Sequence, residues 1–228
     1  MLRRLRRAIV RLIGVFVVAS VAVVALYRFV DPPATPLMLL RLVERWRAGE
    51  PGRWEYEPVP LAAVSPSLQR AVIAAEDARF FVHHGVDVAA ARKAARHNAR
   101  TRGRRLRGAS TITMQCAKNV FLWPGRTWVR KAFEVWFALL LEALWGKRRI
   151  LEVYLAVAEW GDGVYGAEAA ARRWFGRRAS ELRAREAALL AAVLPNPRKW
   201  SPVGGSAYVR ARASIIERRA SAVRLGGR

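Results

Sequence analysis

The sequence has little cysteine and histidine. Its 228 residues include one cysteine and three histidines. The single thiol, Cys116, excludes an intrachain disulfide, and so few thiols and imidazoles cannot assemble the usual zinc ligand sets. We therefore predict no protein metal site. No run of alternating apolar and polar residues indicates a half-buried strand either, so we predict a mainly α-helical fold.

Acidic residues are also scarce. The chain has 17 Asp and Glu against 41 Lys and Arg, a net charge of +24, and only five of the 41 are lysines. This excess indicates either an arginine-rich solvated surface or an anionic partner such as nucleic acid, lipid headgroups or a pyrophosphate-bearing substrate. The same alternatives apply to residues 92–107, a basic stretch without an acid, for which we favour contact with anionic headgroups.

The N-terminus contains a long uncharged segment. Residues 1–11 carry five arginines, and residues 12–27 carry no charge. We predict a basic cytoplasmic tail at 1–11, a transmembrane helix at 12–30 and a periplasmic remainder, in a single-pass protein of a bacterial inner membrane. A cleaved signal peptide is the alternative, but no clear small-x-small site follows. This topology disfavours nucleic acid as a partner.

The rest of the chain shows helical periodicity. Residues 31–60 are predicted to form a linker, a short amphipathic helix at 37–46 and a turn-rich connection. A helix should begin at Ser65-Pro66, where serine is an N-cap and proline suits the first turn. The apolar stretch 127–145 predicts a central, buried helix ended by Gly146. Further helices are predicted at 147–161, 165–176, 179–197 and 207–220.

Two glutamates lie in apolar surroundings. Glu76 follows Val72-Ile73-Ala74-Ala75, and desolvation there would suit its carboxylate to act as a general base near neutral pH. Glu134 lies in the apolar stretch 127–145, just after Arg130 and Lys131. Acids are seldom buried without a partner, so Glu134 is either part of a structural salt bridge or a working group.

The stretch "GASTITMQCAKN", residues 108–119, is rich in small hydroxyl side chains. It is either a Ser/Thr-capped helix start or a cradle for phosphate oxygens. Arg126, Arg130 and Lys131 follow it. Two carboxylates, a hydroxyl-rich turn and a group of cations together suit glycosyl or phosphoryl transfer from an anionic leaving group.

Four motifs in order resemble those of the peptidoglycan glycosyltransferase family. They are "EDARFFVHHGVD" (76–87), "GASTITMQCAKN" (108–119), "RKAFE" (130–134) and "KRRILEVYLA" (147–156). The resemblance implies a lysozyme-like helical domain with a small membrane-apposed subdomain, at 61–220. It also implies polymerisation of lipid II onto a growing glycan chain, with release of undecaprenyl pyrophosphate, beside cell-wall synthesis or division proteins. The chain lacks the Ser-x-x-Lys and Lys-Thr-Gly signatures of a transpeptidase.

The resemblance also implies roles for individual residues. Glu76 matches the general base that takes the proton from the acceptor's 4-hydroxyl, and Glu134 matches the glutamate on the donor's pyrophosphate side. Inversion at the anomeric carbon needs groups on opposite sides of the reacting bond. The matching donor-site cations are Lys118, Arg126, Arg130 and Lys131, and the matching polar contacts are Ser110, Thr111, Gln115 and Asn119. Mg²⁺ or another divalent cation at the pyrophosphate fits the family, and no organic cofactor is implied.

Three positions depart from the family pattern. Met114 replaces a glutamine, Cys116 an aliphatic residue and Ala156 an asparagine. The first removes a polar donor-site contact, and the third affects a helix-end hydrogen bond. None removes a proposed acid, base or cation. Two other functions remain: a lysozyme-like hydrolase or lytic enzyme acting on finished glycan, and a non-catalytic anchor protein that recruits cell-wall enzymes.

Overall fold

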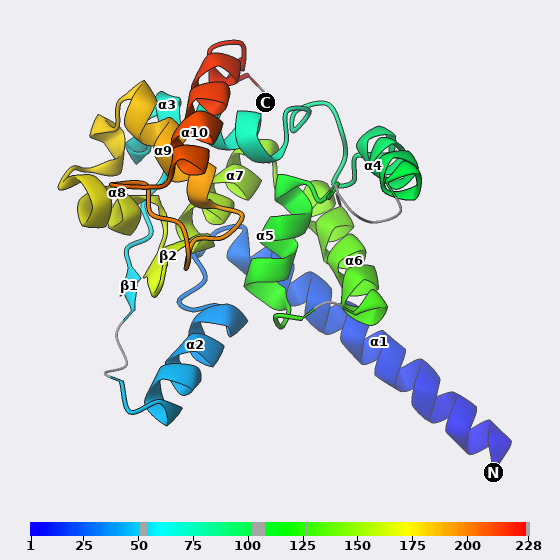
Figure 1. Ribbon diagram of the computed structural model, residues 1–228. Helices are drawn as coiled ribbons and strands as arrows, with labels where there is room; N and C mark the ends of the chain where they lie inside the picture. The colour runs from blue at the N-terminus through cyan, green and yellow to red at the C-terminus, as the bar shows by residue number, and fades with distance from the viewer. Residues whose placement is uncertain (51–53, 102–107, 126, 227–228) are drawn as a thin grey trace.

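The computed structural model describes residues 1–50, 54–101, 108–125 and 127–226. A long N-terminal helix, α1 (Leu2–Tyr27), projects from a group of shorter helices, and the C-terminus lies on the opposite side of the molecule (Figure 1). The mainly α-helical architecture predicted from the sequence is confirmed.

The remaining elements are short. The helices are α2 (Pro36–Arg47), α3 (Pro66–Glu76), α4 (Val88–Arg100), α5 (Ile112–Phe121), α6 (Trp128–Leu144), α7 (Lys147–Val157), α8 (Ala167–Phe175), α9 (Ala184–Val193) and α10 (Ala207–Ala220). Two 3₁₀ turns are η1 (Leu61–Ala63) and η2 (Ala179–Glu181). Helix α3 packs against α9 and α10, and α5 packs against α6 and α7.

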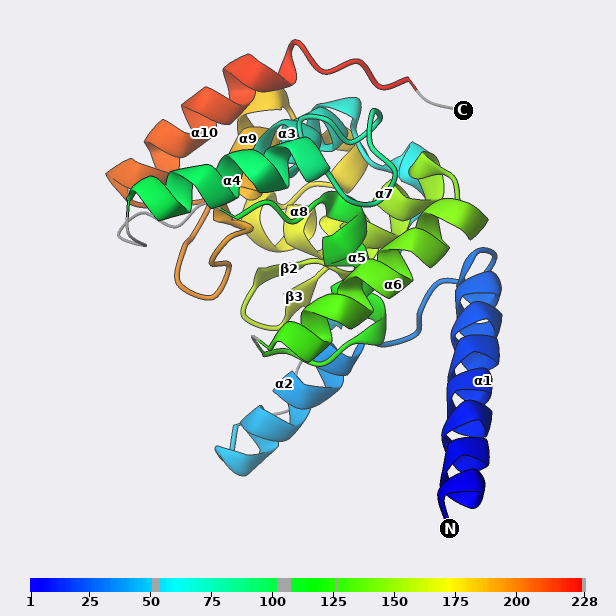
Figure 2. The same cartoon turned by 90° about the vertical axis from the view of Figure 1, so that its right-hand side faces the viewer.

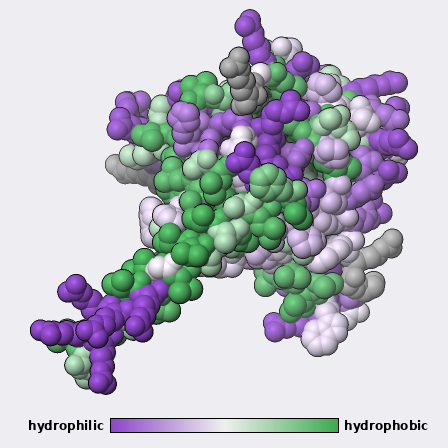
Figure 3. Space-filling model, turned by 180° about the vertical axis from the view of Figure 1, so that it is seen from behind, coloured by the Kyte–Doolittle hydropathy of each residue, from purple (hydrophilic) through white to green (hydrophobic). Residues whose placement is uncertain are grey.

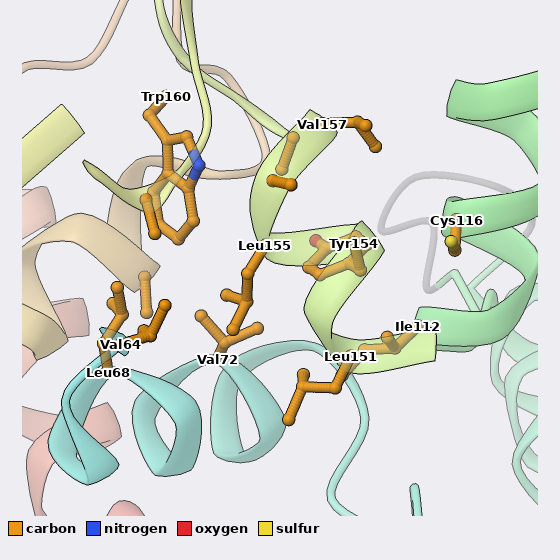
Figure 4. Packing of buried hydrophobic residues seen from close by; sticks show 14 of the residues in the cluster. Val64, Leu68, Val72, Ile112, Cys116, Leu151, Tyr154, Leu155, Val157 and Trp160 are labelled. Carbon is orange, nitrogen blue, oxygen red and sulfur yellow. The ribbon is translucent and has the colours of Figure 1, made fainter. Parts of the chain in front are cut away.

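The core lies around α7. In Figure 4, Leu155 of α7 lies over Val72 of α3, and Leu151 lies to one side of Val72, next to Ile112 of α5. Tyr154, on the same helix, is fully buried. The interior therefore joins the α3 side of the molecule to the α5 side through one continuous cluster of buried side chains. This packing fixes the end of α3 relative to α5.

Side-chain caps set where these two helices begin. The Ser65 hydroxyl accepts a hydrogen bond from the Leu68 amide at 3.1 Å, with Pro66 in the first turn, as predicted. The Thr111 hydroxyl accepts one from the Met114 amide at 3.1 Å. Such caps satisfy amides that have no partner within the helix. Residues 108–111 therefore lead directly into α5, while Glu76 is the last residue of α3.

The sequence indicated no strand, but the structure contains a few short ones. The described residues include a small sheet of β1 (Glu55–Tyr56), β2 (Glu159–Gly161) and β3 (Val164–Tyr165) in the order β1-β3-β2. β1 runs parallel to β3, with Tyr56 opposite Tyr165, and β2 runs antiparallel to β3. Segments of two or three residues are too short to show alternation. The helix predicted at 147–161 therefore ends earlier, and the 49–60 connection is not turn throughout.

The helix predicted at 127–145 is less central than expected. Helix α6 buries Glu134, Phe137 and Leu141, but Trp128 is 91% exposed and Leu139 is 51% exposed. Its apolar outer face therefore meets α1 and the surroundings rather than the core.

Two predicted helix boundaries are also wrong. Gly146 does not end α6, which stops at Leu144; with a φ of −84° it is the N-cap of α7. The predicted helix 179–197 is instead the turn η2 followed by α9, because Leu182 and Arg183 adopt extended backbone angles.

Helix α1 continues through the predicted basic tail and is held against the domain at its C-terminal half. The Trp136 indole donates to the Ser20 hydroxyl at 3.2 Å, and the Trp145 indole donates to the Val24 carbonyl at 2.7 Å. Within the described residues, α1 is the one helix long and apolar enough to cross a membrane. Figure 3 shows its apolar surface continuing onto the adjoining face of the domain.

Candidate active site

Glu76 is contacted from two helices, and a residue of a third helix supports one of these contacts. The Gln115 amide donates to Glu76 Oε2 at 2.9 Å, and the Tyr154 hydroxyl donates to Gln115 Oε1 at 3.2 Å. The Arg212 guanidinium, from α10, lies 3.6 Å from Glu76 Oε1. The Glu76 side chain keeps 14% exposure. Its carboxylate is thus oriented by a neutral amide and a longer ion pair, and part of it stays open to another group.

Sequence reasoning missed Tyr154 and Arg212. Tyr154 lies within the fourth motif but has the pattern of a core residue, and its side chain is indeed fully buried. Arg212 lies beyond the four motifs, among many arginines. Only the packing of α10 against α3 identifies it as the one near Glu76. No signal in the sequence distinguishes it from its neighbours.

Glu134 has a different environment. Its side chain is 4% exposed, and its Oε1 accepts a short hydrogen bond from Arg130 Nη1. Lys131 Nζ lies 2.8 Å from Oε2 and also donates to the Ser110 hydroxyl at 2.9 Å. The pairs are three and four residues apart on α6, the spacing that brings side chains together on one helix face. Both carboxylate oxygens therefore have cationic partners.

Lys118 connects the two glutamates electrostatically. Burial lowers the pKa of its ammonium group, and the neighbouring cations Arg130 and Lys131 lower it further. Glu134 and, more weakly, Glu76 act in the opposite direction and favour the charged form. Lys118 thus lies within the field of both carboxylates. Gln115, which contacts Glu76, is on the same helix three residues earlier. Helix α5 therefore contributes a residue to the surroundings of each glutamate.

The turn after α3 aligns Glu76 with α5. Asp77 Oδ2 accepts a hydrogen bond from the Ile112 amide at 3.0 Å and lies 2.8 Å from His83 Nε2, and both acid and imidazole are buried. Gly85 closes this turn with a φ of +85°, and a Cβ there would lie 3.2 Å from the Ala138 carbonyl oxygen. A larger residue at Gly85 would therefore disturb the placement of Glu76.

The remaining predicted site residues are less open. The Thr111 hydroxyl caps α5 and donates to the Gly85 carbonyl at 2.5 Å, and both Thr111 and Asn119 are buried. Met114 belongs to the hydrophobic core, so this departure from the family pattern changes packing rather than a surface contact. Arg126 lies outside the described residues.

The described residues do not form a protein metal site. Among them, no group of three or more His, Cys, Asp or Glu side chains is placed to hold an ion. The acid closest to the cation group, Glu134, already has Arg130 and Lys131 on its two oxygens. The donor set does not fit a resident metal.

Comparison with known proteins gives the family first and then several similar proteins. A family model described as Transglycosylase matches residues 47–221, and the chain belongs to this family. A biosynthetic peptidoglycan transglycosylase of Rhodospirillum centenum is 55% identical over 230 residues, covering 100% of this chain and 95% of that protein. Proteins of the same name from Caulobacter vibrioides (48% identical, 99% and 95% covered) and Pseudomonas entomophila (51%, 100% and 93%) are also similar.

Proposed function

We propose that this protein is an inverting peptidoglycan glycosyltransferase that polymerises lipid II into β-1,4-linked glycan strands in cell-wall biosynthesis. The observation that carries the proposal is the contrast within one site between a partly open Glu76 and a cation group around Glu134. The family and the names of the similar proteins support the same activity.

Glu76 is proposed as the general base. A Glu76 carboxylate oxygen accepts the proton of the acceptor's 4-hydroxyl. At the same time the 4-hydroxyl oxygen forms a bond to the anomeric carbon of the growing chain. The bond from this carbon to the pyrophosphate breaks, and the electron pair leaves with the polyprenyl pyrophosphate. The hydrogen bond from Gln115 at 2.9 Å orients the carboxylate without itself supplying a positive charge. A correctly placed base contributes about 10²- to 10⁴-fold to rate.

The cation group is proposed to bind the departing pyrophosphate. Lys118, Arg130 and Lys131 surround one acid, Glu134. This leaves an excess of positive charge that an anionic phosphate would neutralise. Glu134 holds Arg130 and Lys131 in place, and Ser110 adds a hydroxyl beside Lys131. Charges fixed before the reaction stabilise the charge that develops in the transition state.

A divalent cation such as Mg²⁺ would neutralise part of the pyrophosphate charge. Because the described residues offer it no ligand cluster, it would be carried mainly by the substrate's own oxygens, and we assign it no step.

We assign α1 as the anchor in a bacterial inner membrane, with a cytoplasmic N-terminus and a periplasmic catalytic domain. We propose a basic tail at 1–11, a transmembrane helix at 12–30, a linker with a membrane-proximal helix at 31–60 and a catalytic domain at 61–220. Cell-wall synthesis or division proteins are the proposed protein partners.

The test is polymerisation of purified lipid II in detergent by the full-length protein, with glycan product resolved by size. We expect strands that a muramidase digests, together with release of undecaprenyl pyrophosphate. A parallel reaction with finished sacculi tests the hydrolase alternative. Digestion of sacculi without polymer formation from lipid II would overturn the proposal, and inactivity in both would favour a non-catalytic anchor.

A further inference from the structure

Helix α2 presents an apolar face that no described residue covers. Leu39, Leu40, Val43 and Trp46 are 53%, 39%, 42% and 77% exposed. Their spacing places them along one stripe of the helix. Met38, on the opposite side, is fully buried. A contiguous apolar stripe on an otherwise strongly charged protein indicates an interaction surface.

The stripe is held in a defined direction by contacts on the inner side of α2. Arg45 forms an ion pair with Asp162 at 2.6 Å, beside the β2–β3 turn. The Tyr56 hydroxyl donates to the Pro32 carbonyl at 2.6 Å, which fastens the segment just before α2. The helix therefore belongs to the domain, and its exposed stripe faces outward.

The position of α1 brings a membrane surface close to α2. The connection between the helices is residues 28–35, and eight residues span at most about 29 Å. The Arg149 guanidinium donates to the carbonyls of Tyr27 and Val30 at 2.8 and 2.9 Å, which ties the end of α1 to the domain. Figures 1 and 2 show α1 and α2 leaving the same side of the domain.

The composition of α2 suits a lipid interface. Arg47 is exposed near the stripe, whereas Arg41 and Arg45 are half-buried and pair with Glu44 and Asp162. Amphipathic helices whose apolar side includes tryptophan and whose exposed flank carries a basic residue suit the interfacial region of anionic membranes. Figure 3 shows the apolar side chains of α2 as a patch separate from the larger apolar surface along α1. The membrane therefore fits both the charge and the apolar stripe.

We propose that α2 lies flat in the outer leaflet of the membrane that α1 crosses, with Leu39, Leu40, Val43 and Trp46 among the lipids. This second contact, away from α1, fixes the tilt of the catalytic domain over the bilayer and hence the height of its site above a lipid-linked substrate. The proposal rests on the membrane anchorage proposed above for α1, and it does not depend on the chemistry at Glu76.

The test places a single probe on the stripe. In the full-length chain, Cys116→Ala removes the native thiol, and Val43→Cys is labelled with an environment-sensitive fluorophore. A matched control carries the label at Ser221→Cys, at the exposed end of α10. Both proteins are reconstituted in vesicles of phosphatidylethanolamine and phosphatidylglycerol that contain nitroxide-labelled lipid. We expect strong quenching at position 43, stronger with shallow than with deep nitroxides, and none at 221.

Absence of lipid quenching at position 43 would overturn the proposal. So would a probe that becomes buried only at high protein density, because that result would assign the stripe to a second copy. If Cys116→Ala impairs folding, a chain with its native thiol carries Leu40→Asp and Val43→Asp instead. We expect several-fold slower polymerisation of lipid II in vesicles but unchanged rates in detergent, and equal rates in vesicles would contradict it. Failure of the wild-type chain to polymerise lipid II at all would refute the proposed function while leaving the quenching result valid.

Discussion

The two glutamates of the site differ in exposure and in the partners of their carboxylate oxygens. Glu76 ends α3, keeps 14% of its side chain exposed, and has an amide on one oxygen and an arginine 3.6 Å from the other. Glu134 lies inside α6, is 4% exposed and contacts a cation through each oxygen. Both oxygens of Glu134 already have cationic partners, whereas Glu76 stays partly open to an approaching group. This difference supports our proposal that Glu76 is the general base and that Glu134 holds the cations in place.

Lys118 links the surroundings of Glu76 and Glu134 electrostatically. It is half-buried, which lowers the pKa of its ammonium group, yet both carboxylates favour its charged form. A buried ammonium group without acids nearby would lose its proton easily. The two glutamates therefore favour a positive charge on Lys118, which we propose as part of the pyrophosphate site.

The largest expected effect is at the open carboxylate. We expect Glu76→Gln to lower the polymerisation rate by about 10²- to 10⁴-fold, because the amide cannot accept the proton. Stability should change little, since the ion pair with Arg212 is long and partly exposed. Lipid II turnover and thermal unfolding of the same preparation measure both. Full activity in this variant would remove Glu76 from the mechanism, and loss of the fold would make the comparison with Glu134 invalid.

Glu134→Gln should instead affect stability and activity together. Removing one member of a buried ion pair leaves Arg130 without its partner and costs about 3 kcal/mol or more in the free energy of unfolding. Displaced cations should also slow polymerisation by about 10²-fold. The control is Glu217→Gln, which removes an exposed partner of Arg185 at 3.4 Å and should cost at most about 1 kcal/mol. Equal destabilisation by Glu134→Gln and Glu217→Gln would contradict the role of Glu134 as the partner in a buried ion pair.

Lys118 provides a pH test of the link between the two sides. Its pKa is lowered from the ordinary 10.5, so its charge is lost at lower pH than that of an exposed lysine. We therefore expect kcat/KM for lipid II to fall on the alkaline side before pH 10.5 is reached. Lys118→Arg should move this alkaline limb to higher pH, because arginine stays charged, while lowering the rate at neutral pH through its different shape. An unchanged limb in the variant would assign the titration to another group.

Much of the fold was predictable because helical periodicity and caps are local signals. The start of α3 at Ser65-Pro66 was predicted correctly, and the structure shows the cap. The sheet was missed because its strands are two or three residues long. One local signal was available: Asp162-Gly163 joins β2 to β3, Gly163 has a φ of +74°, and Asp-Gly is typical of a hairpin turn.

The site divides in the same way. The pairing of Glu134 with Arg130 and Lys131 follows from helical spacing, so the sequence identified the group. The partners of Glu76 lie 39 and 136 positions away, at Gln115 and Arg212. Contacts at such separation depend on how helices pack, and no periodicity within one segment indicates them. The motifs suggested Gln115 as a polar contact of the donor site, and the structure places it between Glu76 and Tyr154.

The smallest expected effect tests that last contact. Tyr154→Phe removes the hydroxyl that donates to Gln115 at 3.2 Å and should lower kcat by about two- to tenfold, the range of one hydrogen bond. KM should change less, because the tyrosine acts through Gln115 and not on substrate. Tyr165→Phe is the matched control, since this fully buried ring has a hydroxyl without a hydrogen-bond partner among the described residues.

A double-mutant cycle separates positioning from packing. If Tyr154 acts through Gln115, adding Tyr154→Phe to Gln115→Ala should cost nothing further, because the orientation of Glu76 is already lost. Additive losses would mean that Tyr154 only stabilises the core, and Glu76 would then be oriented by Gln115 and Arg212 alone. The Glu76 carboxylate would then have one supporting contact fewer, and the difference between Glu76 and Glu134 in how firmly they are held would be larger.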